Sequence, residues 1–231
     1  MDLLARQMAE RRERILAAAQ EIIGEHGYQA LTMRELAQAS RVTVPTIYNL
    51  IGSKEAVLFA AVEYRTDHYV ERLAASEGAA PCERVLSIVD ACVDEFLSLP
   101  HYYRSMLGLI YASQSAGSMR LRTSRAVREP IAQALIELSA AGELAAWIDP
   151  RSLANQIESL VQVASLRWAT GSMTDADLRH AATHGAALLL LGVTAESQRA
   201  RLEELARGSQ AHGHSPPAAP SESAERVRSS S

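Results

Sequence analysis

The chain has 231 residues, of which 48% are hydrophobic and 22% charged, a balance typical of a globular protein. The net charge is -4, and the first 65 residues carry eight basic and eight acidic side chains, so bulk positive charge cannot support nucleic-acid binding. No run of about 18 uncharged apolar residues occurs. The polar N-terminus also lacks the apolar segment of a secretory signal, so we expect a cytoplasmic protein with no membrane span.

Apolar residues recur at helical spacing along the whole chain, and no strand-like alternation persists, so we predict an all-α fold. The first helix is predicted for residues 9–26. Ile15, Ala19 and Ile22 recur on one of its faces. Gly27 suits the left-handed position that follows a helix end.

Three further helices are predicted from their start signals. Thr32 and Glu35 have the spacing of a capping box, in which hydroxyl and carboxylate each bind the other's backbone N–H. Thr43 is an N-cap residue with Pro45 in the first turn, where the missing N–H of proline costs nothing. Ser53 is the third N-cap. The predicted helices cover residues 32–39, 43–50 and 53 to beyond 64.

The second and third helices are too short to be stable alone and must pack on their neighbours. The apolar residues available for this packing are Leu36, Ala37, Val42, Ile47 and Ile51. A compact helix-turn-helix from about Thr32 to Ile51 is the simplest arrangement. No acidic residue lies between Leu36 and Lys54, whereas Arg41 and Lys54, the only lysine of the chain, are basic. The local charge of this segment therefore favours an approach to DNA.

The order and spacing of several sequence blocks resemble the N-terminal domain of TetR-type (TetR/AcrR) bacterial transcriptional regulators. The blocks are Gly27-Tyr28, Thr32-x-x-x-Leu36-Ala37, Thr46-Ile47-Tyr48 and Ser53-Lys54-Glu55. The resemblance implies a helix-turn-helix domain followed by a helical domain that binds a small-molecule effector and forms a homodimer. It also implies a repressor that is released from a palindromic operator in double-stranded DNA when the effector binds.

The resemblance assigns DNA contacts to the helix-turn-helix from about Thr32 to Ile51, which we call the reading unit. Positions matching Thr43, Thr46, Tyr48 and Lys54 commonly touch phosphates, and those matching Val44, Pro45 and Asn49 face the bases. An asparagine amide is suited to bidentate recognition of adenine. Arg41 departs from the family, which usually has glycine there. Either the turn keeps its shape, with Arg41 strained by about 1 kcal/mol, or the turn differs and Arg41 contacts a phosphate. Ile51 replaces a usual aromatic residue.

The remainder of the chain has the pattern of longer helices. Asp149 before Pro150, and Thr174 before Asp177, are further helix starts. Helices are predicted for residues 81–99, 102–113, 118–141, 150–170, 175–192 and 195–207. The resulting domains are a DNA-binding domain at 9–65, an effector-binding and dimerisation domain at 78–207, and a disordered tail rich in serine, proline, alanine and glycine at 208–231.

Two sets of side chains are candidates for the roles that the resemblance gives the second domain. The dimer candidates lie on the last two long helices and are Ile157, Leu160, Val161, Ala164, Trp168, Leu188 and Leu189. The effector-pocket candidates are Tyr102, Tyr103, Arg104, Met106, Ile110, Met119 and Trp147, although a stripe of aromatic and methionine residues is more often plain core. The acid-free stretch 96–128 contains five arginines, which indicate an anionic effector, proximity to DNA or simply a solvated face.

Other functions have less support. A DNA-binding regulator without a ligand remains an alternative, as does an α-helical enzyme. No glycine-rich phosphate loop, serine elbow or carboxylate pair is present, so we expect no catalytic residues. Cys82 and Cys92 would lie about 15 Å apart on one helix, too far for a disulfide. Their roles are packing or, alternatively, redox sensing. His180 and His184 have metal-compatible spacing without a third ligand nearby, so we expect neither a metal nor a cofactor.

Overall fold

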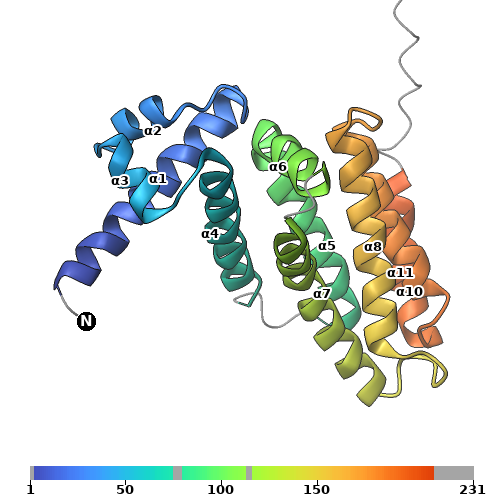
Figure 1. Cartoon of the computed structure of the whole chain (residues 1–231). Helices are drawn as coiled ribbons and strands as arrows, with labels where there is room; N and C mark the ends of the chain where they lie inside the picture. The colour runs from blue at the N-terminus through green and yellow to red at the C-terminus, as the bar shows by residue number, and fades with distance from the viewer. Residues whose placement is uncertain (1–2, 75–79, 113–115, 211–231) are drawn as a thin grey trace, which may run out of the picture.

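The computed structural model describes residues 3–74, 80–112 and 116–210 (Figure 1). The predicted all-α fold is confirmed. Within these ranges the only β-pairing is an isolated bridge between Leu144 and Thr194. No helix in these ranges combines the length and the apolar character that crossing a bilayer requires. Most of the predicted tail, residues 211–231, lies outside the described part of the chain.

The helix bounds follow the predicted segments closely. In chain order the helices are α1 (Leu3–His26), α2 (Met33–Ala39), α3 (Val44–Leu50), α4 (Lys54–Ala74), α5 (Pro81–Ser98), α6 (Pro100–Ala112), α7 (Gly117–Ala140), α8 (Pro150–Ala169), α9 (Asp175–Arg179), the π-helical turn η2 (His180–His184), α10 (Gly185–Leu191) and α11 (Glu196–Gln210). The largest differences are the earlier start of α1 and the extension of α11 beyond residue 207.

The first four helices form one end of the molecule, with α1 packed against α2, α3 and α4 (Figure 1). The first turns of α1, up to Arg14, are exposed where the structure describes their side chains, and the core begins at Ile15. Gly27 has a φ of 80° and ends α1, and its N–H donates to the Ile23 carbonyl at 2.9 Å. This left-handed glycine agrees with the predicted end of the helix.

The remaining helices lie side by side at the other end, where α7 packs between α5 and α8, and α8 lies next to α10 (Figure 1). A single cluster of buried apolar residues extends from Ile15 in α1 to Ala206 in α11. The reading unit and the second helical region therefore share one continuous core.

The segment 175–192 was predicted as one helix, and it contains a π-helical turn. α9 runs into η2, which continues directly into α10. At Gly185, an added Cβ would lie 2.6 Å from Cδ2 of Leu160 in α8. The two helices approach so closely here that a larger residue would require the Leu160 side chain to shift.

The predicted helix caps of the second region are confirmed. The Asp149 carboxylate accepts the Ser152 N–H at 2.8 Å and begins α8. Thr174 and Asp177 form a complete capping box at the start of α9. At α2, by contrast, the Thr32 hydroxyl accepts the backbone N–H three residues on, and the reciprocal bond is absent from this part of the described chain.

The cysteine and histidine pairs serve packing. Cys82 and Cys92 are both buried and free. Burial raises the pKa of the Cys82 thiol to about 11, which disfavours the reactive thiolate. The rings of His180 and His184 stack 4.8 Å apart, and Nδ1 of His184 lies 3.0 Å from the Ala206 carbonyl of α11. This histidine pair therefore helps to dock α11.

Candidate DNA-binding surface and ligand cavity

The reading unit is fixed by caps at its helix starts and by one buried side chain in α3. The Thr43 hydroxyl accepts the Thr46 N–H at 3.3 Å, and the two hydroxyl oxygens lie 2.8 Å apart. Ile47 is fully buried and is the only buried residue of α3. α3, the predicted recognition helix, is thus held in place by Ile47 on its inner face, while its outer face is exposed.

The outward face of α3 carries residues that the sequence assigned to DNA. Pro45, Tyr48 and Asn49 are exposed, and the Tyr48 side chain is 54% exposed despite its aromatic ring. Val44 and Thr46 are partly exposed beside them. These short or flat side chains would let the helix approach a groove closely. Their contacts with DNA stay a prediction.

Arg41 lies in the turn between α2 and α3 and has a φ of 54°. It is the only non-glycine residue with positive φ in the described ranges. The turn therefore keeps the shape that usually requires glycine, and arginine is strained there by about 1 kcal/mol. Beneath it, Ser40 is buried, and its hydroxyl donates to the Leu36 carbonyl at 2.5 Å. The exposed Arg41 side chain remains free to face DNA.

Lys54 has a structural role that the sequence did not indicate. Its Nζ donates to the Gln29 carbonyl at 3.2 Å and lies 4.6 Å above the Tyr28 ring. The Tyr28 N–H in turn donates to the Ser105 hydroxyl of α6 at 3.3 Å. Lys54 therefore joins the start of α4 to the loop after α1, and that loop is joined to the second region.

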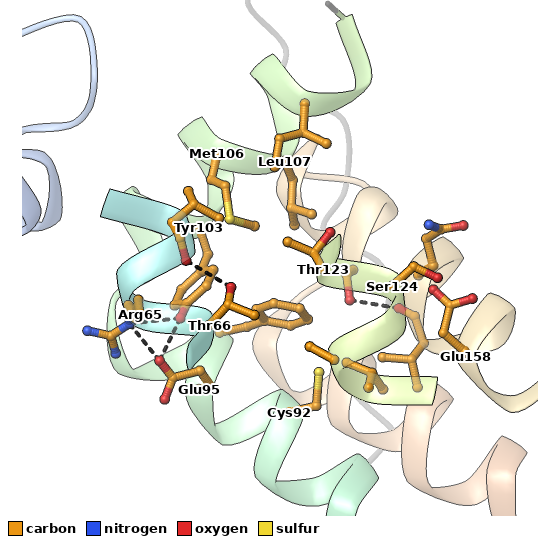
Figure 2. A pocket seen from close by; sticks show the side chains of 18 of the residues that line it. Arg65, Thr66, Cys92, Glu95, Tyr103, Met106, Leu107, Thr123, Ser124 and Glu158 are labelled. Carbon is orange, nitrogen blue, oxygen red and sulfur yellow. Dashed lines mark hydrogen bonds and ion pairs between the residues drawn. The ribbon is translucent and has the colours of Figure 1, made fainter. Parts of the chain in front are cut away.

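A small cavity of about 90 Å³ lies among α4, α5, α6, α7 and α8 (Figure 2). Four of the predicted pocket residues line it, namely Tyr102, Tyr103, Met106 and Ile110. Most of the other lining residues were missed, because they lie on helices far apart in the sequence and meet only in the folded chain. They include Arg65 and Thr66 of α4, Glu95 and Phe96 of α5, and Glu158 of α8.

A polar network forms one end of the cavity (Figure 2). Nε of Arg65 donates to the Tyr103 hydroxyl at 2.8 Å, and that hydroxyl donates to Oε1 of Glu95 at 2.6 Å. Arg65 and Glu95 also form an ion pair at 2.6 Å. Burial, followed by the nearby Glu95 charge, raises the pKa of Tyr103. The network ties α4 to α5 and α6.

Glu158 and Tyr102 provide the other notable polar groups of the cavity. Glu158 accepts a hydrogen bond from Ser124 of α7, and burial raises the pKa of its carboxyl group (Figure 2). The Tyr102 hydroxyl is fully buried and has no hydrogen-bond partner in the described structure. Burial raises the pKa of Tyr102 as well, so the hydroxyl keeps its proton.

Comparison with known proteins assigns the family. The family model for bacterial regulatory proteins of the tetR family matches residues 15–61, which contain the reading unit. The HTH-type transcriptional repressor ComR of Escherichia coli is 26% identical over 184 residues, covering 74% of this chain and 86% of ComR.

The chain belongs to the TetR family. Members of this family are DNA-binding transcriptional regulators and not enzymes. Two solved TetR-like structures with bound ligands share the fold. RolR, in complex with resorcinol, has a TM-score of 0.64 at 17% identity and covers 87% of this chain and 95% of its own. FadR from Bacillus subtilis, in complex with stearoyl-CoA, has a TM-score of 0.63 at 20% identity and covers 78% and 98%.

Three predicted pocket residues of this TetR-type chain do not line the cavity. Arg104 stacks 4.7 Å from the Trp168 ring and pairs with Asp175 at 3.7 Å, so its charge is used outside the cavity. Met119 is buried elsewhere in the core. Trp147 is 77% exposed in the connection between α7 and α8. Aromatic character alone therefore misplaced it.

The predicted dimer stripe is largely internal to the TetR-type subunit. Ile157, Val161, Ala164 and Trp168 are buried without any partner chain, and Val161 lines the cavity. Nε1 of Trp168 donates to Asp175 at 2.7 Å. The prediction was wrong for these four residues, because the apolar face of α8 packs on its own subunit. Leu188, by contrast, is 52% exposed.

Proposed function

We propose that the protein is a repressor that binds a palindromic operator as a homodimer and leaves it when a small molecule enters the cavity. The observation that carries this proposal is the placement of α4. Lys54 begins this helix beside the reading unit, and Arg65 and Thr66 lie on the cavity wall. Eleven residues of helix separate Lys54 from Arg65, or about 16 Å. A shift of this wall of the cavity would therefore move α4, whose Ala60 and Ala61 belong to the cluster against which Ile51 packs at the end of α3.

The size of the cavity supports a ligand-driven shift. A cavity of about 150 Å³ is large enough for benzene. The cavity here, at about 90 Å³, is smaller, so a ligand with one ring would press on its walls. α4 is one of those walls. RolR and FadR, which share the fold, have ligands bound in their structures.

The proposed DNA contacts follow the exposed surface of the reading unit. Thr43 and Thr46 would bind phosphate through their hydroxyl groups at the start of α3. Tyr48, Lys54 and Arg41 would add contacts to the backbone. The base-reading set would comprise Val44, Pro45 and Asn49. The neutral net charge of this region makes the positions of these few groups decisive.

The proposed dimer interface uses the exposed faces of α8 and α10. Val163 is 57% exposed, and it shares the outward face of α8 with Gln156 and Ser159, which carry no charge. Leu188 is exposed on the neighbouring α10. Two such helix pairs related by a two-fold axis would form a four-helix bundle. The dimer would place its recognition helices about 34 Å apart or further on a palindrome.

The proposed domain division keeps 9–65 as the DNA-binding part and 78–207 as the part that binds the effector and the partner subunit. Because one core connects them, they would act as coupled parts and not as independent modules.

A gel-shift titration of the full-length protein against the intergenic DNA upstream of its own gene tests the proposal. Lys54→Ala should weaken binding evenly across sequences and lower the salt dependence by about one counterion per subunit, with Lys54→Arg as the control. Asn49→Ala should instead relax the preference at one base pair in each half-site. A protein that binds no fragment specifically would refute the proposal. Specific binding that no ligand alters would leave a ligand-independent regulator.

A further inference from the structure

The charges that line the cavity disfavour an anionic ligand. Arg65, Glu95 and Glu158 are the charged residues among the described lining residues. The charge of Arg65 is already matched by Glu95 at 2.6 Å. Glu158 thus leaves the lining with a net negative charge. Arg128 attracts this carboxylate, but it does not line the cavity and pairs with Glu129 at 3.5 Å. A second carboxylate placed here would be desolvated without a partner.

The five arginines of the acid-free stretch do not change this balance. None of Arg104, Arg120, Arg122, Arg125 and Arg128 is among the lining residues that the structure describes. Arg120 donates to the Ile110 carbonyl at 2.7 Å, which fixes it to the backbone of α6. The interpretation of these arginines as an anion site is therefore not supported.

The Tyr102 hydroxyl is a buried hydrogen-bond donor without an acceptor in the described structure. Tyr102 is one of the residues that line the cavity, and none of its surface is accessible to solvent. Neighbouring Tyr103 uses its own hydroxyl in the network with Arg65 and Glu95, whereas that of Tyr102 has no partner in the described structure. Buried polar groups in native proteins are nearly always bonded. A ligand oxygen in the cavity would complete this one.

Uncharged polar side chains also line the cavity, namely Thr66, Thr123, Ser124, Gln162 and Ser165. The remaining walls are apolar, and one of them is adaptable. They are formed mainly by Phe96, Met106, Leu107, Ile110, Val127 and Val161. Methionine has three rotatable bonds, so Met106 can move aside for a ligand that is larger than the empty cavity. Such walls favour a hydrocarbon framework over a polar one.

We infer that the effector is a compact, uncharged and largely apolar molecule with an oxygen acceptor, which receives the hydrogen bond of the Tyr102 hydroxyl. This inference rests on the proposed function, because it describes the ligand of the same cavity. It separates this protein from FadR, whose solved structure contains stearoyl-CoA. A single ring with a carbonyl or hydroxyl group is the size and polarity that the walls accept.

Three probes of similar size test the polarity of the cavity. Binding of acetophenone, toluene and benzoate to the full-length protein is measured without DNA by saturation-transfer NMR and calorimetry. We expect acetophenone to bind most tightly and benzoate to bind at least about tenfold more weakly. Benzoate that binds as tightly as acetophenone would overturn the inference, as would a lack of acetophenone binding at millimolar concentration.

Tyr102→Phe tests the proposed donor. The variant should bind acetophenone about threefold to tenfold more weakly and toluene with unchanged affinity, because toluene accepts no hydrogen bond. Tyr111→Phe is the matched control, since Tyr111 also lines the cavity but its hydroxyl is already bonded to Gln162. Tyr102→Phe should also keep the urea midpoint of the wild type or raise it, because it removes an unpartnered buried group. Equal losses for acetophenone and toluene would exclude Tyr102 as the donor.

Glu158→Gln tests the exclusion of anions. The variant should reduce the difference in affinity between benzoate and acetophenone. An unchanged difference would contradict the argument from the charges of the lining. These measurements contain no operator, so they stand apart from the gel shift. Acetophenone that binds without releasing DNA would weaken the repressor mechanism but not the ligand class. A protein that binds its operator but does not bind acetophenone would contradict the ligand class and leave the DNA-binding function intact.

Discussion

The reading unit and the cavity satisfy their polar groups in opposite ways. In the reading unit and at the start of α4, each helix is capped by a hydroxyl three residues before the N–H from which it accepts, as in the pairs Thr32–Glu35, Thr43–Thr46 and Ser53–Ala56. In the cavity, Arg65 reaches Tyr103 across 38 residues of sequence, and the Tyr102 hydroxyl has no partner in the described structure. The shape of the reading unit is set locally, whereas the cavity depends on how five helices sit together.

This difference indicates which region is built to stay fixed and which to change. Locally capped helices keep their form when their neighbours move slightly. A cavity whose polar groups are shared between helices alters when any one of those helices shifts. The family mechanism of ligand-driven release needs one region of each kind, and α4 contacts both.

Ile47→Ala would have the largest effect and would test whether the reading unit is held from beneath. Removing a fully buried isoleucine costs about 2–5 kcal/mol, so the urea midpoint should fall and specific DNA binding should be lost at 37 °C. Tyr48→Ala, next to it on the exposed face, should leave stability within about 0.5 kcal/mol and weaken only DNA binding. Similar losses of stability in the two variants would refute the distinction.

Val62→Phe would test whether the cavity controls the reading unit through α4. Val62 lines the cavity from this helix, and the larger ring would fill the space as a ligand does. A coupling of about 1–3 kcal/mol predicts operator affinity lower by about fivefold or more. The measurement is a gel shift paired with urea unfolding. Unchanged operator affinity in a variant of unchanged stability would separate the two regions.

Arg41→Gly would sharpen the description of the turn. Glycine adopts the φ of 54° without strain, so the variant should be more stable by about 1 kcal/mol in urea unfolding. Operator affinity should fall at low salt, because the substitution removes a proposed phosphate contact. A variant that gains stability and keeps its affinity at every salt concentration would remove Arg41 from the contact set.

Asp149→Ala has the smallest expected effect and contrasts the caps of the two regions. Hydrogen bonds from the Ser152 hydroxyl and N–H hold the pKa of Asp149 below its usual range. A lowered folded-state pKa means that the stabilisation is present above the unfolded value of about 3.9 and is lost as the pH falls below it. Thermal unfolding at pH 7 should therefore show a lower midpoint for the variant, with a difference that vanishes in stronger acid. Thr43→Ala, which removes a neutral cap, should lower the midpoint equally at both pH values.

The sequence predicted the helix starts and ends well because their determinants are local. The caps at Thr43 and Asp149 and the end of α1 at Gly27 each depend on residues within one helical turn. The strained turn was one of two alternatives, and the positive φ of Arg41 decided between them. The interruption at η2 was not predicted, since nothing in the local pattern of 175–192 departs from an ordinary helix.

The cavity was predicted only where its residues cluster on one helix. Tyr102, Tyr103, Met106 and Ile110 all lie on α6, and their stripe was visible in the sequence. Glu158 gave no signal, because its role depends on where α7 and α8 meet. The assignment of Trp168 to a dimer failed for the same reason, since periodicity identifies an apolar face without identifying what covers it.

The continuous core and the shared α4 have a consequence at the level of the whole cell. Coupling between two binding sites is reciprocal. If the ligand lowers the affinity of the regulator for its operator, the operator must lower the affinity for the ligand by the same factor. DNA-bound protein would then sense its effector less readily than free protein. The ligand concentration needed to release the regulator would therefore rise with the fraction of the regulator that is bound to operators. A strain that carries extra operator copies should need more ligand to release the bound regulator.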